Sequence, residues 1–175
     1  MLDKLKQFKL LIVLFLFLLA IPLYFTYNHF QQSSVLKEAF EKNERIEVLH
    51  RLTASEKYAP DIRKAGYVVP PDGAIRLDGG IDSIGIKGDI DLKISNPGRN
   101  EVTVLFETTA KEEKIDVYYI LDNQLTIKRS YYSNISNQKI KESVDISQAE
   151  EERLLKIVQK ELEDFMEKMY QTLYG

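Results

Sequence analysis

The sequence contains no cysteine and no tryptophan, and only two of its 175 residues are histidine. Without cysteine the chain forms no disulfide and no thiolate metal site, and it has no cysteine nucleophile and no lipid attachment site of the bacterial lipoprotein kind. Neither His29 nor His50 belongs to an HxxxH or HExxH pattern, so a zinc hydrolase is not predicted. The stability of the folded part must therefore come from an apolar core.

Other patterns typical of enzymatic or metal sites are also missing. The sequence has no GxSxG turn, and its glycine pairs lack the helix and lysine of a phosphate-binding loop. Asp78, Asp82, Asp89 and Asp91 do not match the EF-hand calcium loop. The last two alternate with apolar residues, which favours the wet face of a strand over an ion site. We predict no catalytic residue, no cofactor and no metal ligand, and we do not expect an enzyme.

The longest apolar stretch runs from Leu10 to Tyr27, and three lysines precede it. Thirteen of its residues are Leu, Ile, Val or Phe, and crossing the hydrocarbon core takes roughly 17–25 mostly apolar residues. We predict a transmembrane helix over residues 10–27, with residues 1–9 in the cytoplasm because of the lysines. The alternative is a cleaved secretory signal, which would have a shorter apolar region of about 7–15 residues and a small-x-small cleavage site.

The remainder is expected to face outward as a linker, residues 28–33, and one extracytoplasmic domain, residues 34–175. About 145 residues follow the anchor, enough for one core. Of the net charge of −3, residues 1–30 carry +2, which leaves −5 on the rest. This acidic balance argues against nucleic-acid binding. A composition rich in Lys, Ile and Glu suits the outer face of a Gram-positive bacterium.

A first amphipathic helix is predicted over residues 34–52. Apolar residues recur three and four positions apart from Leu36 to Phe40 and again from Ile46 to Leu52. Ser34 is a suitable N-cap, and Asn43 marks a break in the pattern.

A longer amphipathic helix is predicted from Ser147 to about Leu173. Ser147 and Glu150 have the spacing of a capping box. The apolar stripe consists of Leu155, Val158, Leu162, Phe165 and Met169. A coiled-coil homodimer through this stripe is the alternative to packing on the sheet, but coiled coils need at least about three or four heptads and the stripe is shorter. Packing on the sheet is favoured.

Alternating apolar and polar residues predict an antiparallel meander. The predicted strands are Gly88–Ser95, Glu101–Thr108, Ile115–Leu121 and Leu125–Tyr131, with shorter candidates at Tyr67–Val69 and Ala74–Leu77 around a turn at residues 70–73. Residues 53–66 are predicted as a loop, and residues 133–144 as a loop or a weak edge strand. In the tyrosine pairs at 118–119 and 131–132, one ring should face the core and the other the surface, because successive strand residues point to opposite faces.

Three segments follow one another in an order that resembles a known family. They are Ser34–Phe40, Ile46–Leu49 and Gly88–Glu107, the last being an alternating strand, a turn with proline and glycine, and a valine-rich return strand. The chain resembles the cytochrome oxidase complex assembly protein family, small membrane-tethered domains akin to the membrane-anchored subunit of the mitochondrial presequence translocase. The resemblance covers residues 34–121, and the C-terminal helix is an addition. It implies contact with proteins and carries no catalytic residue.

We therefore expect an α+β protein with an N-terminal transmembrane helix, a juxtamembrane helix, a twisted antiparallel sheet of about four to six strands and a long C-terminal helix. The expected function is binding of a membrane-protein partner, and the resemblance implies a role in assembling a membrane (respiratory) complex. The alternative is a cell-envelope sensor or small-ligand-binding module, which predicts a concave pocket with converging polar groups.

Overall fold

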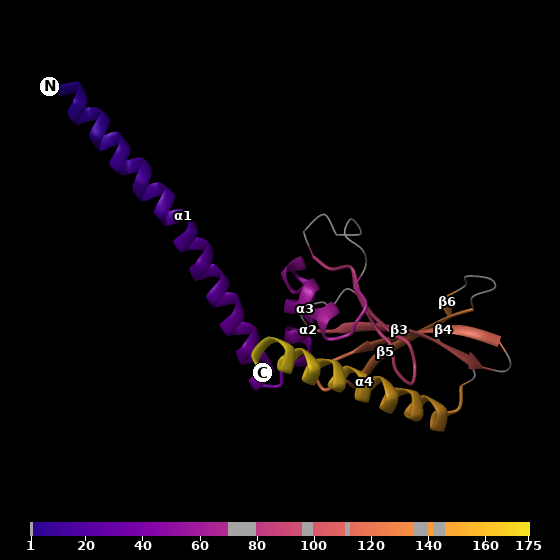
Figure 1. Ribbon diagram of the computed structural model, residues 1–175. Helices are drawn as coiled ribbons and strands as arrows, with labels where there is room; N and C mark the ends of the chain where they lie inside the picture. Colours follow the sequence, from indigo (N-terminus) through magenta and orange to yellow (C-terminus); the bar gives the residue numbers. More distant parts are fainter. Residues whose placement is uncertain (1, 70–79, 96–99, 111–112, 135–139, 142–145) are drawn as a thin grey trace. The chain divides into compact units, whose positions relative to one another are not determined.

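The computed structural model describes residues 2–69, 80–95, 100–110, 113–134, 140–141 and 146–175 (Figure 1). Within the first range, side chains are described at residues 15–27, 31 and 33–69. The chain divides into two compact units, Met1–Glu38 and Ala39–Gly175.

Helix α1 (Leu2–Glu41) is one uninterrupted helix. It runs through residues 28–33, so the prediction that Ser34 caps a new helix is wrong. The Ser34 hydroxyl instead donates to the Gln31 carbonyl at 3.3 Å. The physical reason is that no glycine or proline lies between Leu23 and Glu41 to end the helix. Among the residues whose side chains the structure describes, no helix has the length and apolar character needed to span a bilayer.

The predicted break at Asn43 is confirmed. Asn43 has a positive φ of 58°, and its N–H donates to the Phe40 carbonyl while the Glu44 N–H donates to the Ala39 carbonyl, both at about 3 Å. These two bonds form a Schellman motif, in which asparagine is the common substitute for glycine. Helix α2 (Arg45–Thr53) starts directly after it.

The prediction of a loop over residues 53–66 is wrong, because this segment contains the 3₁₀ helix η1 (Glu56–Tyr58) and helix α3 (Ala59–Lys64). The sequence nevertheless contains helix-start and helix-end signals at the ends of these two elements. Ser55 caps η1 by accepting from the Lys57 N–H, and Pro60 lies in the first turn of α3, where its missing N–H costs little. Gly66, with a φ of 94°, ends α3 in a second Schellman motif.

The second unit contains an antiparallel sheet of six strands in the order β1-β2-β3-β4-β5-β6. Its strands are β1 (Ser83–Ile86), β2 (Leu92–Ser95), β3 (Val102–Ala110), β4 (Glu113–Leu121), β5 (Ile127–Asn134) and β6 (Ile140–Lys141). The predicted α+β class and meander are confirmed. Strand β1 was not predicted, and β2 starts later than expected, at Leu92. The short β6 agrees with the edge-strand alternative for residues 133–144, while the predicted turn at 70–73 and the strand at 74–77 lie outside the described residues.

Helix α4 (Gln148–Tyr174) covers one face of the sheet (Figure 1). The predicted N-cap is confirmed, since Ser147 Oγ accepts from the Glu150 N–H at 3.3 Å. The helix buries Leu154, Val158, Glu161, Leu162, Phe165, Met166 and Met169. The predicted stripe is therefore right from Val158 onward and wrong at its start, where Leu154 is buried and Leu155 is only half-buried. The buried stripe agrees with packing inside the chain.

The sheet has one buried and one partly exposed face. Tyr119 and Tyr132 are buried, whereas Tyr118 and Tyr131 are partly exposed, as the alternation predicted. Tyr118 and Tyr131 are direct cross-strand partners. The core therefore lies between the sheet and the helices of the second unit.

Candidate functional site

A groove with a volume of about 450 Å³ lies between the end of α1, the start of α2 and the C-terminal half of α4. It lies entirely within the unit Ala39–Gly175. Its lining residues are Phe40, Glu41, Asn43, Arg45, Val48, Glu163, Met166, Glu167 and Tyr170. We call these residues the α1–α4 groove. Its volume is within the range of about 300–1,000 Å³ typical of ligand pockets.

One wall of the groove is aromatic. Phe40 contacts Tyr170 edge to face, with ring centroids 5.6 Å apart, and Tyr174 at 6.2 Å. The two tyrosine rings are 5.4 Å apart. These separations are those of rings in contact, so the three rings pack together and leave no room for a guest between them, and Phe40 and Tyr170 line the groove. Tyr170 keeps 36% of its surface exposed, so the wall presents a ring face or edge to the groove.

Apolar side chains continue from this wall into the domain core. Val48, on α2, and Met166, one turn before Tyr170 on α4, are both buried. A flexible methionine adapts to the shape of what it contacts. The groove can therefore hold an apolar side chain without opening the core.

The rim of the groove carries three glutamates and one arginine. Arg45 Nη2 pairs with Glu163 Oε1 at 3.1 Å, with side chains 21% and 57% exposed. Arg45 Nε is buried and makes no hydrogen bond in the described structure. Glu167 accepts a hydrogen bond from the neutral Gln171 amide at 3.3 Å. With Glu41, the rim has an excess of negative charge.

The position of Arg45 depends on the sheet. Arg45 is the first residue of α2, and the N-cap residue Glu44 makes no side-chain capping bond. The free N–H of Ile46 donates instead to Asn123 Oδ1, in the β4–β5 turn, at 3.1 Å. A side chain far away in the sequence thus caps the helix that carries the only basic residue among those lining the groove.

A buried carboxylate, Glu161, lies outside the groove. Its side chain is 8% exposed, and its Oε1 accepts from the Asp89 N–H at 3.2 Å. A Cβ at Gly88 would collide with this carboxylate. Glu161 therefore attaches the loop before β2 to α4, which is a structural role.

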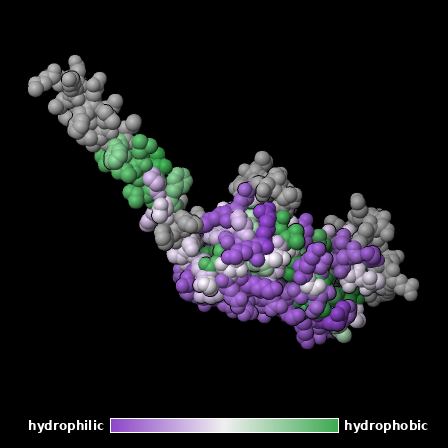
Figure 2. All heavy atoms as spheres, viewed as in Figure 1, coloured by the Kyte–Doolittle hydropathy of each residue, from purple (hydrophilic) through white to green (hydrophobic). Residues whose placement is uncertain are grey.

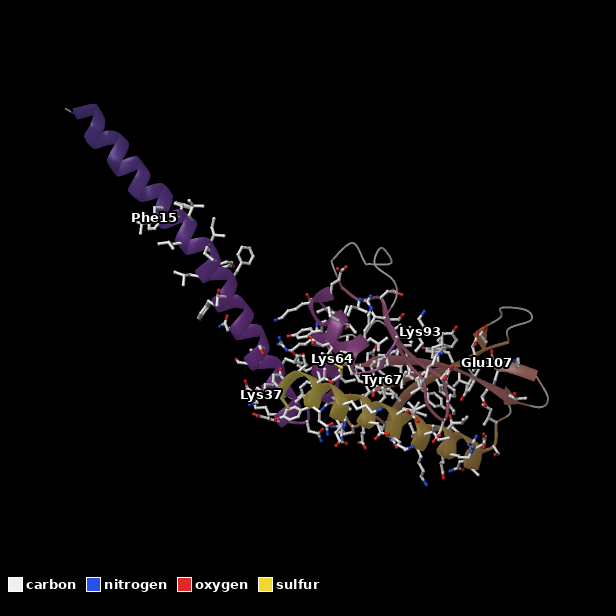
Figure 3. All side chains as sticks on the ribbon, in the orientation of Figure 1. Phe15, Lys37, Lys64, Tyr67, Lys93 and Glu107 are labelled. Atoms are coloured by element: carbon white, nitrogen blue, oxygen red, sulfur yellow. The ribbon has the colours of Figure 1, made fainter. Side chains whose placement is uncertain are left out.

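Burial shifts the pKa of several further titratable side chains, among them Tyr67, Tyr119 and Lys57. Burial raises the pKa of Tyr67 to about 12, with Asp164 adding to the effect. Tyr67, labelled in Figure 3, packs against the Phe165 ring at 4.7 Å. Burial also raises the pKa of Tyr119 and lowers that of Lys57, whose ammonium lies over the Tyr58 ring. These groups are spread through the core and do not converge on the groove.

The sequence predicted no catalytic, cofactor or metal residue. In the part of the chain that the structure describes, no three His, Asp or Glu side chains are grouped so that they could hold a metal ion. Asp82, Asp89 and Asp91 are exposed. The predicted strand face for Asp89 and Asp91 is wrong, because both precede β2, and Asp89 pairs with Lys160 at 3.4 Å. Asp78 lies outside the described residues. His50 is half-buried on α2.

The α1–α4 groove was not predicted from the sequence. Its two halves come from residues 40–48 and 163–170, which are far apart in the sequence. The available signal was the aromatic pair Tyr170 and Tyr174 at the end of α4, which is one turn apart and therefore on one helix face. Comparison with protein-family models, with curated proteins and with solved structures found no match.

Proposed function

We propose that this chain is a membrane-tethered, extracytoplasmic interaction domain that binds a membrane-protein partner through the α1–α4 groove. The observation that carries the proposal is the groove itself, an apolar and aromatic surface with a charged rim, formed by residues 40–48 and 163–170. The family resemblance suggests assembly of a membrane (respiratory) complex as the task.

The tether is supported by the apolar side chains of α1. Every residue from Phe15 to Tyr27 is exposed, and the large apolar side chains of this stretch have 45–69% of their surface exposed. Figure 2 shows this part of α1 as a hydrophobic stretch. Contiguous apolar patches of this kind on a protein surface are typical of membrane or protein contact. The complete apolar run of the sequence, from Leu10 to Tyr27, is long enough for a transmembrane helix.

The proposed tether also explains why a groove of low intrinsic affinity is sufficient for binding a partner. Phe40 follows Tyr27 by 13 residues, which span at most about 45 Å even when fully extended. Whatever conformation the connection takes, the groove remains close to the membrane surface. Confinement raises the effective concentration of nearby membrane partners, so a modest intrinsic affinity is enough.

The experiment is site-specific photo-cross-linking in native membranes with the full chain. A photoreactive phenylalanine analogue replaces either Tyr170, in the groove, or Lys93, which is exposed on the sheet. We expect one membrane protein to be enriched in the adducts from position 170 and not from position 93. Equal recovery from both positions, or none from position 170, would refute partner binding through the groove.

Topology is tested separately. Protease added to intact protoplasts should cleave the exposed face of α4, since the domain is proposed to lie outside the cell. Complete protection, with cleavage after lysis, would overturn the orientation.

A second candidate is a sensor or small-ligand-binding module, which the groove volume favours because about 450 Å³ is sufficient for a small molecule. Native mass spectrometry of the full chain released from nanodiscs separates the two. A bound small molecule that is lost on replacement of Tyr170 by serine would support the sensor.

A further inference from the structure

The charge on the rim of the α1–α4 groove shows which partner chemistry the groove can accept. Glu163 and Glu167 are four residues apart on α4, so their carboxylates lie on one helix face, where like charges repel. Arg45 pairs with Glu163, and the described bond of Glu167 comes from a neutral amide. An additional cation near Glu167 would relieve this repulsion.

We propose that the α1–α4 groove binds a cationic, amphipathic peptide segment of the partner, with a lysine or arginine at Glu163 and Glu167 and a neighbouring apolar side chain against Tyr170 and Met166. This inference rests on the proposed function, because it names the chemistry of the partner of the same site. The site is the negative rim beside the aromatic wall.

The aromatic wall suits the same occupant. The face of an aromatic ring attracts a cation, and arginine stacks on it particularly well. The half-exposed Tyr170 ring lies one turn beyond Glu167 and Met166 on α4, so a single short segment can reach all three. The groove therefore combines the apolar contact and the negative charge that recognise an amphipathic basic segment.

The same distances argue against a small quaternary ammonium ion enclosed by aromatic rings. The centroids of Phe40, Tyr170 and Tyr174 are 5.4–6.2 Å apart, and rings in contact cannot surround a guest. A cation can approach the exposed part of Tyr170 in the groove that Glu163 and Glu167 also line. A segment lying across the groove fits this arrangement, and an enclosed ion does not.

The test uses the full chain in phosphatidylcholine nanodiscs and a synthetic probe, acetyl-Lys-Leu-Lys-Ala-Leu-Lys-amide, in which one leucine is photoreactive. The control probe has glutamate in place of each lysine, and empty nanodiscs measure binding to lipid. Mass spectrometry maps the adducts. We expect adducts of the basic probe at Met166 and Tyr170, and none of the acidic probe above background.

Variants separate the charge from the apolar contact. Glu163→Gln and Glu167→Gln should each weaken probe binding by about 1.5- to 5-fold, the range for exposed ion pairs, and 0.5 M NaCl should weaken it further because the screening length falls to a few Å. Glu152→Gln is the matched control: it removes the same charge from an exposed position on the same helix and should leave binding unchanged. Tyr170→Phe should retain binding and Tyr170→Ser should reduce it. Unfolding of each variant is measured in parallel.

Equal binding of the two probes, or adducts confined to the sheet, would overturn the inference. A native partner that is cross-linked from position 170 through a segment without lysine or arginine would also overturn it, and the proposed function would stand. Absence of any partner adduct from position 170 in membranes refutes the proposed function itself. The two failures are therefore distinguishable.

Discussion

The effect of Gly88→Ala should reverse in sign when Glu161 is also changed. In the native chain, an alanine methyl group at position 88 would collide with the Glu161 carboxylate. The carboxylate must then move away from the Asp89 N–H, to which it is bonded at 3.2 Å. A hydrogen bond to a charged group contributes about 1.5–3 kcal/mol, and Glu161 is 8% exposed, so little water is available to replace it.

In the Glu161→Ala background the collision and the bond are both absent. There Gly88→Ala should stabilise the protein by about 0.4–1 kcal/mol, because alanine restricts the unfolded chain and position 88 has no positive φ that would strain it. In the native background the same substitution should destabilise by about 1–2 kcal/mol, which is the lost bond less the gain from the unfolded state. The coupling between the two positions is thus about 2 kcal/mol.

The assay is urea unfolding of the full chain in detergent, followed by far-ultraviolet circular dichroism, for the four members of the cycle. Midpoints of Gly88→Ala should move in opposite directions in the two backgrounds. Glu152→Gln, which changes an exposed carboxylate on the same helix, is the control for charge removal. Gly88→Ala shifts of the same sign and size in both backgrounds would refute the role assigned to Glu161.

Three other changes test the fold. Asn123→Ala removes the cap of α2 and should lower the free energy of unfolding by about 0.5–2 kcal/mol in a denaturant titration. Gln124→Ala, an exposed change in the same turn, should lower it by less than about 0.5 kcal/mol. Equal losses for the two variants would contradict the capping role of Asn123. Leu154→Ala should lower the free energy of unfolding by about 2–5 kcal/mol because the side chain is fully buried, and Leu155→Ala should lower it clearly less. A larger loss for Leu155→Ala would contradict the burial of Leu154 and support the helix face predicted from the sequence. The pKa of Tyr67 is raised to about 12 in the folded state, compared with about 10 in the unfolded chain. Between these two pH values the folded state keeps the phenolic proton that the unfolded chain loses, so stability should fall as pH rises from about 10 to 12. Tyr67→Phe should reduce this loss in unfolding curves measured across that range, and an unchanged pH profile would contradict it.

Prediction from the sequence succeeded where one strong local pattern determines the structure. Val102, Val104 and Phe106 recur at every second position, and all three are buried in β3. The Ser147 cap and the stripe from Val158 are equally local. At the start of α4 the pattern was ambiguous, because two adjacent leucines fit it, and tertiary packing chose Leu154.

Prediction failed where residues distant in the sequence decide the outcome. Strand β1 contains only four residues and is recognisable mainly through its pairing with β2. The segment containing η1 and α3 was too short to show a period, although Pro60 and Gly66 mark its ends. The groove combines α1, α2 and α4, so no single stretch of sequence carries its pattern.

The turn between β4 and β5 links the sheet to the groove. Asp122 holds the turn by accepting from the Thr126 hydroxyl at 2.7 Å and from the Thr126 N–H at 3.0 Å, and these bonds lower the pKa of Asp122. The turn presents the next residue, Asn123, to the N-terminus of α2. Because Arg45 is the first residue of that helix, its pairing with Glu163 depends on a turn outside the groove. A change that loosens this turn should therefore alter recognition at the rim before it unfolds the sheet, since the cap is one hydrogen bond and the sheet is held by many.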